Sequence, residues 1–239
     1  LGNFAATVSE GAVSAADLTT ISTQTSGTVN ATAATAINGT ASAVATALAD
    51  TEITHSDSFA VTLTAGSVAA TDLTAIDAAT SAVVDASAIT TITGTIADIN
   101  TIYASSGFSG LGDEAVTITD TGSVAASVLN TLNSNTTGLV TATSVATLTG
   151  TAVAINTLVG NEGDSGDKVN LDGDFTVTVS NGTTTASQLN TINTATTGLV
   201  TATAVATVSG SVSDLVTLVG NEGTSGDKVD LKADVAITV

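Results

Sequence analysis

The sequence predicts an α/β tandem-repeat protein, a solenoid-like rod in which each repeat of 55–60 residues contributes strands and short helices. Three observations lead to this prediction. Leucine and glycine positions recur at a near-constant period, stretches of period-two alternation recur inside each period, and stretches of helical spacing follow them. Because aromatic residues make up only 2% of the chain, a single repeat buries little surface, and stacked repeats would share one core.

The repeat register depends on one leucine and two glycines in each copy. The leucines are Leu18, Leu73, Leu129 and Leu189, at spacings of 55, 56 and 60 residues. The glycines are Gly11, Gly66, Gly122 and Gly182, followed by Gly39, Gly94, Gly150 and Gly210. We therefore divide the chain into repeats 1–58, 59–114, 115–174 and 175–234. Residues 235–239 are predicted to be the first strand of a further repeat or an inter-subunit strand.

Each repeat is expected to open with a strand. Residues 61–64 and 177–180 alternate β-branched and polar side chains, which is typical of a half-buried strand. The glycines Gly66 and Gly182 follow and are predicted to end these strands in a turn. The same pattern predicts strands at residues 4–8 and 235–239.

A helix is expected after this first strand. In repeat 2, Ala69, Leu73 and Ile76 lie at i, i+4 and i+7, so that one apolar stripe can pack on a sheet. In repeat 1, Ser14 and Asp17 have the spacing of a helix N-cap.

The second half of a repeat resembles the first. A strand is predicted at residues 83–86 in repeat 2 and at residues 139–142 in repeat 3, and a further strand at residues 89–93 in repeat 2. Thr95 and Asp98 then repeat the capping spacing, and a helical stripe is predicted at Ile96, Ile99 and Ile102. Each repeat therefore reads β-α-β-(β)-α, as two coils of one strand and one helix. The alternative fold is a string of small β-sandwich domains.

The composition excludes several classes of partner. The chain has 22 acidic and three basic residues, a net charge of −19, and no Cys. Nucleic acids and anionic membrane surfaces require clustered Lys or Arg, so neither is an expected partner. No apolar run approaches the ~20 residues that membrane insertion requires. Without Cys, disulfides, thiolate metal sites and a cysteine nucleophile are impossible.

The sequence does not favour an enzyme. Ser and Thr hydroxyls need a neighbouring base to become nucleophiles, and the single histidine, His55, has no counterpart in the other repeats. We expect His55 to be a loop residue and predict no catalytic site.

Acidic residues gather at two junctions between repeats. Calcium binds six to eight oxygens from carboxylates, amides and main-chain carbonyls, which suits these segments. The predicted metal ligands are Glu162, Asp164, Asp167, Asp172 and Asp174 at the first junction, and Glu222, Asp227, Asp230 and Asp234 at the second. The alternative is a solvated acidic hinge that confers solubility.

Residues 121–140, TGSVAASVLNTLNSNTTGLV, and residues 143–158, TSVATLTGTAVAINTL, resemble tandem repeats of giant extracellular surface proteins of cyanobacteria and marine bacteria. This group includes S-layer-like coats and RTX-type, calcium-dependent adhesins. The resemblance covers residues 4–239 and implies an extracellular structural role, secretion without disulfides and calcium dependence. The glycine-rich calcium nonapeptide of RTX-type repeats is missing from this chain.

These observations predict a non-enzymatic structural protein, a repeat segment of a cell-surface layer, filament or adhesive stalk. Its expected partner is itself, as a head-to-tail homo-oligomer or as neighbouring repeats of a longer chain. We expect residues 235–239 to join the sheet of the next unit by strand addition. The alternative is a ligand- or glycan-binding adhesin whose specificity resides in residues 103–113, where Tyr103 and Phe108 supply paired aromatic side chains.

Overall fold

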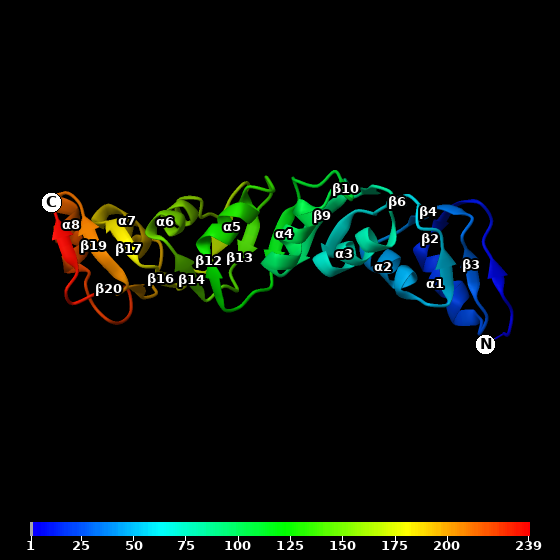
Figure 1. The fold of residues 1–239 in the computed structure, drawn as a ribbon, viewed down its shortest axis with the longest axis horizontal. Helices are drawn as coiled ribbons and strands as arrows, with labels where there is room; N and C mark the ends of the chain where they lie inside the picture. Colours follow the sequence, from blue (N-terminus) through cyan, green and yellow to red (C-terminus); the bar gives the residue numbers. More distant parts are fainter. Residues whose placement is uncertain (1) are drawn as a thin grey trace. The chain divides into compact units, whose positions relative to one another are not determined.

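The computed structural model describes residues 2–239 and divides into two compact units, Leu1–Thr117 and Ile118–Val239 (Figure 1). In the described residues there are eight helices and several sheets of parallel strands. The chain is therefore an α/β protein, which confirms the predicted fold class at this level. The parallel pairing and the helices do not correspond to a string of all-β sandwich domains.

The first unit holds four helices of nine or ten residues. They are α1 (Ala15–Gln24), α2 (Ala41–Ala49), α3 (Ala70–Ala79) and α4 (Ile96–Ala104). Its strands are β1 (Ala6–Thr7), β2 (Gly11–Ser14), β3 (Val29–Ala31), β4 (Ala34–Asn38), β5 (Ile53–His55), β6 (Val61–Thr62), β7 (Gly66–Ala69), β8 (Val84–Asp85), β9 (Ile89–Gly94) and β10 (Phe108–Ser109). Strand β11 (Ala115–Ile118) lies across the boundary between the units.

The second unit also holds four helices. They are α5 (Ala126–Asn133), α6 (Ala152–Gly160), α7 (Ala186–Thr194) and α8 (Val212–Gly220). Its strands are β12 (Ser123–Ala125), β13 (Val140–Ala142), β14 (Thr147–Gly150), β15 (Val169–Leu171), β16 (Thr176–Val179), β17 (Gly182–Thr185), β18 (Val200–Ala202), β19 (Val205–Ser209), β20 (Val229–Leu231) and β21 (Ala236–Thr238).

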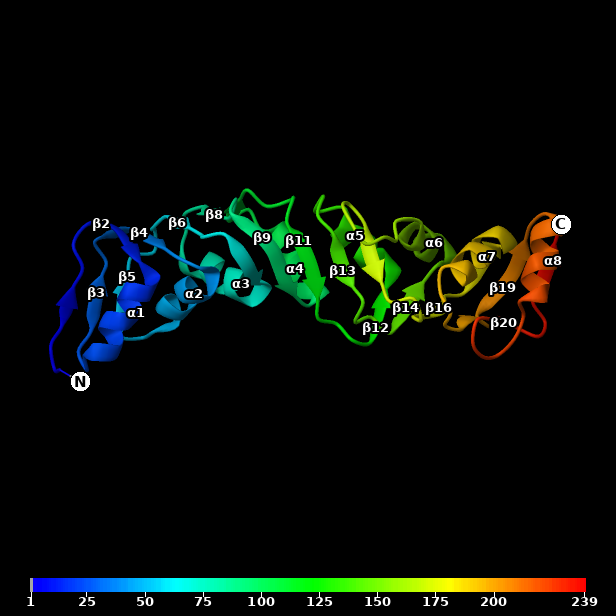
Figure 2. The same cartoon turned by 180° about the vertical axis from the view of Figure 1, so that it is seen from behind.

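Strand partners in both units are parallel and lie two strands apart in the chain. In the first unit the sheets contain β1-β3-β5, β2-β4, β6-β8-β10 and β7-β9. In the second unit they contain β13-β15, β12-β14-β16-β18-β20 and β17-β19-β21. Parallel neighbours require a crossover connection, and here each crossover contains one helix. Each helix packs on the next within its unit, in chain order (Figure 2).

The strand count per coil differs from the prediction. We define a coil as a helix together with the strands that precede it since the previous helix. Coils ending in α2, α4, α6 and α8 hold two strands, and those ending in α3 and α7 hold three. In the coil of α3, the middle strand β6 contacts β4 of the preceding coil and pairs with β8 of the following one. The additional strand β6 thus lies between β4 of the preceding coil and β8 of the following coil.

The first strands β6 and β16 end before Gly66 and Gly182, as predicted, but these glycines do not lie in the turn that was expected there. Each of these glycines begins a second strand, β7 or β17, and the pairing shifts register immediately after it. Gly66 has φ of 148° and Gly182 has φ of 137°, a backbone conformation that residues with a side chain rarely adopt. The glycine forms a bulge, and the chain continues as a strand toward the helix.

The helices were located correctly, with a one-residue difference at α3. Leu73 and Ile76 are fully buried, but the third buried residue is Ala70, because Ala69 is the N-cap. Ser14 and Thr95 accept hydrogen bonds from the backbone N–H groups of Asp17 and Asp98, as the capping pattern predicted.

Two different causes explain the second set of glycines: Gly39 and Gly150 have φ of 155° and 143°, whereas Gly94 and Gly210 are closely packed at the second helix of their repeats. Gly94 precedes the N-cap of α4, and a Cβ atom there would lie 2.9 Å from the Cβ atom of Ala70. At Gly210 the corresponding distance, to Ala186, is 3.2 Å. Ala70 and Ala186 are 0% exposed, so the first residue of one helix rests against the glycine that leads into the next.

Candidate functional site

Two polar contacts recur in the repeats, and both connect segments distant in sequence. The first, which we call the junction bond, starts at the residue four positions after the register leucine. It joins the end of the first helix of a repeat to the segment after the second helix. The four bonds are Ser22 to Asp50 (2.7 Å), Ser105 to Asp77 (2.8 Å), Asn133 to Asp167 (3.4 Å) and Asn193 to Asp227 (3.2 Å), each written from donor to acceptor.

The spacing of the junction bond reveals an insertion. Its partners lie 28 residues apart in the first two repeats and 34 apart in the last two. The difference of six residues corresponds to the loop that follows α6 and α8. In both loops the carboxylate reaches back to the preceding first helix, so the contact is kept although the loop is longer.

The second recurring contact, which we call the threonine bracket, lies seven residues after the register leucine. Its members are Thr25, Thr80, Thr136 and Thr196, which are all buried, at 4–9% exposure. The Thr80 hydroxyl donates to the Phe59 carbonyl (2.7 Å) and accepts from the Ala82 N–H (3.1 Å). Thr25 and Thr196 donate to the carbonyls of Phe4 and Phe175, and Thr136 accepts from the Gly138 N–H (3.0 Å).

The bracket fixes the first strand of a repeat against the turn after its first helix. Because the hydroxyl is buried and both donates and accepts, replacing it would leave main-chain groups without partners. At Gly198 the approach is so close that a Cβ atom would lie 2.3 Å from the Phe175 oxygen.

Eight of the nine predicted calcium ligands lie in loops around the junction bonds, and Asp230 lies in strand β20. Eight of them are exposed and Asp230 is half-buried. Across residues 2–239, no three acidic or histidine side chains form a group that could hold a metal ion. Asp167 and Asp227 instead accept the junction bonds, and Asp234 forms an ion pair with Lys232, Nζ to Oδ1, at 2.9 Å. This hydrogen-bonded ammonium lowers the pKa of Asp234.

The two junction loops share one conformation. In each, the residue after the helix, Asn161 or Asn221, accepts a main-chain hydrogen bond from Val169 or Val229. Gly166 and Gly226 have φ of 68° and 67°, which permits the tight turn before the acceptor carboxylate. The loops are therefore ordered by main-chain contacts formed within the protein.

Buried amides lie beside the junctions of the second unit. The Oδ1 atoms of Asn130, Asn133, Asn190 and Asn193 are buried without a hydrogen-bond partner. The Nδ2 groups of Asn130 and Asn190 donate to the carbonyls of Ala154 and Asp214 on the next helix, at 2.9 and 3.0 Å. These amides therefore connect successive helices.

Two open polar grooves run beside α7. One, of about 450 Å³, includes Asn190 and Asp214, and the other, of about 390 Å³, includes Asn193 and Asp227. Both are lined mainly by threonine, amide and carboxylate groups, which can hydrogen-bond a polar ligand.

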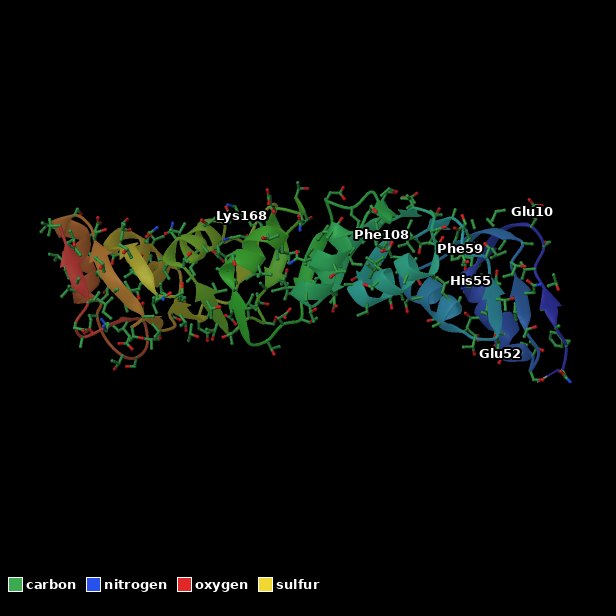
Figure 3. All side chains as sticks on the ribbon, viewed as in Figure 1. Glu10, Glu52, His55, Phe59, Phe108 and Lys168 are labelled. Atoms are coloured by element: carbon green, nitrogen blue, oxygen red, sulfur yellow. The ribbon has the colours of Figure 1, made fainter. Side chains whose placement is uncertain are left out.

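His55 is the last residue of β5, so the prediction of a loop residue was wrong, and it takes part in internal contacts, as do Phe59 and Tyr103. His55 donates from Nδ1 to the Ser56 carbonyl (2.9 Å), and its ring lies edge-on to Phe59 at 5.1 Å between centroids (Figure 3). The Tyr103 hydroxyl donates to Oε1 of Glu114, whose other oxygen accepts from the Gly112 N–H at 2.9 Å. Glu114 is 2% exposed, so this acid serves the packing of residues 103–114.

Sequence reasoning missed both recurring contacts. A signal for them exists: each lies at a fixed offset from the register leucine, with a hydroxyl at every bracket position. The junction position varies between Ser, Asp and Asn, so it does not stand out by residue type.

No protein-family model, curated protein or solved structure matches this chain. In the described residues, none of the helices has the length and apolar character needed to cross a bilayer.

Proposed function

We propose that this chain is a non-enzymatic structural protein whose repeats stack as a solenoid and serve in an extracellular surface layer, filament or adhesive stalk. The observation that carries the proposal is the recurrence of the same inter-coil contacts in all four repeats. A scaffold needs successive coils to bind one another in the same way. The junction bond joins the two coils of a repeat at a fixed position in all four repeats, and the threonine bracket joins a first strand to the turn after the next helix at Thr25, Thr80 and Thr196.

The stacking part of the proposal draws on the contacts within each unit. Helices pack on one another in chain order, and parallel strands pair from one coil to the next. Deleting residues 136–195 would put the TTGLVTAT segment of residues 196–203 in the place of the identical segment at residues 136–143 and remove one period of 60 residues. We expect the shortened chain to fold with the same helical fraction and a smaller maximum dimension in X-ray scattering. An unfolded product would contradict interchangeable stacking.

The extracellular part rests on composition. An acidic surface free of Cys stays soluble in salt water and needs no redox protection, and the resemblance to surface-protein repeats agrees with it.

Calcium is proposed as a stiffening ion at the two junctions. The observations in its favour are the oxygen-rich loops and the unpartnered Oδ1 atoms of Asn133 and Asn193. Because three carboxylates do not converge, amide and main-chain oxygens would supply most ligands.

Electron microscopy of the purified chain in calcium and in a chelator tests assembly and calcium together. We expect head-to-tail polymers that shorten or become more flexible when the chelator is added. Single particles at every protein concentration in both buffers would contradict a self-assembling role.

Glycan binding is the second candidate function. The polar grooves beside α7 favour it, since sugars are held by amide and carboxylate groups. A glycan array read with and without calcium would test this role, and binding that survives Asp227→Ala and Asp214→Ala together would exclude these grooves.

A further inference from the structure

The outer face of α8 is an uncovered apolar surface. Val212, Val216 and Val219 are 61–67% exposed and, with Leu215 and Val239, line a groove of about 340 Å³. Sixty residues earlier, α6 packs between α5 and α7, and Ala152, the counterpart of Val212, is 5% exposed. Asn156 and Val159, the counterparts of Val216 and Val219, are half-buried. The valines of α8 therefore occupy positions that are less exposed on α6, against which the following helix packs.

Strand β21, beside this helix, is open along one edge. It pairs with β19 and is the outermost strand of its sheet in the described residues. Its counterpart sixty residues earlier, β16, pairs on both sides, with β14 and with β18. Ile237 and Val239 are 48% and 85% exposed, whereas the matching residues of β16, Val177 and Val179, are both 1% exposed.

The matching surface lies at the first coil of the chain. Ile21 on α1 is only half-buried, although its counterparts Ile76, Leu132 and Ile192 are 0% exposed. Phe4 is 49% exposed, against 1% for Phe59 and 2% for Phe175. The first coil therefore exposes Phe4 and Ile21, whose counterparts Phe59, Phe175, Ile76 and Ile192 are buried.

Strands β1 and β21 occupy the same position in the repeat. Residues 4–8 and 235–239 both align with residues 175–179 of β16. Strand β1 pairs with β3 at Ala6–Val29 and Thr7–Asn30, as β16 pairs with β18 at Val177–Val200 and Thr178–Thr201. The open edge of β21 corresponds to the edge that β1 presents to β3.

We propose that two copies of this chain join by strand exchange: β21 of one copy displaces β1 of a second copy, pairs with β3 there, and lets α1 of that copy cover the valines of α8. The inference rests on the proposed head-to-tail function and names its interface.

Exchange is favoured over simple docking because both strands would otherwise compete for one position. Ile237 aligns with Ala6, so at this position β21 brings a larger apolar side chain beside β3 than β1 does; Val235 aligns with the larger Phe4, but Phe4 is 49% exposed in the first coil. Strand β1 is only two residues long and the Phe4 side chain before it is half exposed, so its displacement costs little apolar burial; the bracket bonds between Phe4 and Thr25 would pass to the main chain of Val235.

Disulfide trapping tests the register, because the chain has no Cys of its own. The repeat alignment places Thr238 of one copy beside Asn30 of the other, and both are exposed. We expect an oxidised mixture of Thr238→Cys and Asn30→Cys chains to give a covalent heterodimer. The matched control mixes Thr238→Cys with Thr54→Cys, an exposed residue at the same level on the next strand, β5, and should give none.

Oligomeric state measured by light scattering gives a second readout. Ile237→Asp would bury an unpaired carboxylate and should raise the dissociation constant of head-to-tail association about a hundredfold or more. Val153→Asp, at a residue 62% exposed on α6, should leave it unchanged.

Monomers at every concentration, or oligomers that are unaffected by Ile237→Asp and form no Thr238–Asn30 disulfide, would overturn strand exchange. The second result would place self-association on a different surface of the chain. Neither would decide the structural role, which the repeat deletion and the chelator experiment test separately.

Discussion

The threonine bracket shows how one buried hydroxyl can organise a repeat. Its hydrogen bonds join a strand to a turn 21 residues away, and a residue of the same shape without the hydroxyl cannot form them. A substitution at this position can therefore measure the contribution of the hydrogen bonds with little change in the volume of the side chain.

Thr80→Val should lower the free energy of unfolding by about 1–3 kcal/mol, because the Phe59 carbonyl and the Ala82 N–H lose their partner in a buried site. Urea unfolding measures the change. The control is Thr62→Val, at an exposed position of β6, which should differ from the parent by less than about 0.5 kcal/mol. Equal effects at both positions would contradict the role of the bracket.

Asp85 offers a prediction about pH. It accepts hydrogen bonds from the Ser87 hydroxyl (2.7 Å) and N–H (3.1 Å), which lower its pKa. A lowered pKa stabilises the fold above the unfolded-state pKa, and this contribution disappears as pH falls through the folded-state value. Ser87→Ala removes the larger cause, so the pKa of Asp85 should rise toward its ordinary value. NMR titration of the side-chain carboxyl measures the shift; an unchanged pKa would contradict the assignment.

At the scale of the element, glycine has two opposite roles in these helices. Gly94 leads into α4 against Ala70, whereas Gly160 ends α6 with no atom within 4 Å of an added Cβ. Substitution by alanine should therefore change the free energy of unfolding in opposite directions at the two sites.

Gly94→Ala should destabilise the protein by about 1–3 kcal/mol through overpacking against Ala70. Gly160→Ala should stabilise it by up to about 1 kcal/mol, because alanine restricts the unfolded chain and favours the helix. Thermal unfolding of the two variants, followed by circular dichroism, gives both signs in one experiment. A neutral or stabilising Gly94→Ala would contradict the close contact.

The elements that sequence reasoning located are those with a clear period. The stripe of Ile96, Ile99 and Ile102 and the cap at Thr95 predicted α4 correctly. The strands β5, β10, β15 and β20, which follow the second helices, were missed because two or three residues give no measurable alternation. They exist because parallel neighbours on the adjacent coil supply their hydrogen bonds, which only the tertiary structure determines.

The candidate site was less predictable than the fold. The acidic loops were visible as composition, but a count of carboxylates does not say whether they converge. In the structure, Asp167 and Asp227 turn toward Asn133 and Asn193. These partners lie 34 residues away and become neighbours only when one coil has closed on the next.

For the whole molecule, a net charge of −19 predicts a protein whose stability rises with ionic strength. Salt screens repulsion between carboxylates, with a Debye length of about 8 Å at 0.15 M. The melting temperature should therefore rise with NaCl whether or not calcium binds.

Calcium is distinguished from screening by a comparison at equal ionic strength. If the junctions bind the ion, millimolar CaCl₂ should raise the melting temperature above that in matched NaCl. Asp167→Asn with Asp227→Asn should remove the additional increase. A gain that survives these substitutions would exclude the two junction aspartates as ligands.

The longer junction loops indicate where such a chain tolerates insertions in evolution. Six additional residues after α6 and α8 leave the following strands in their parallel pairing, because the loop closes on itself through Val169 and Val229. The tips, at residues 164–166 and 224–226, are exposed. They are places where foreign peptides could be inserted and displayed at regular intervals without disturbing the framework that carries them.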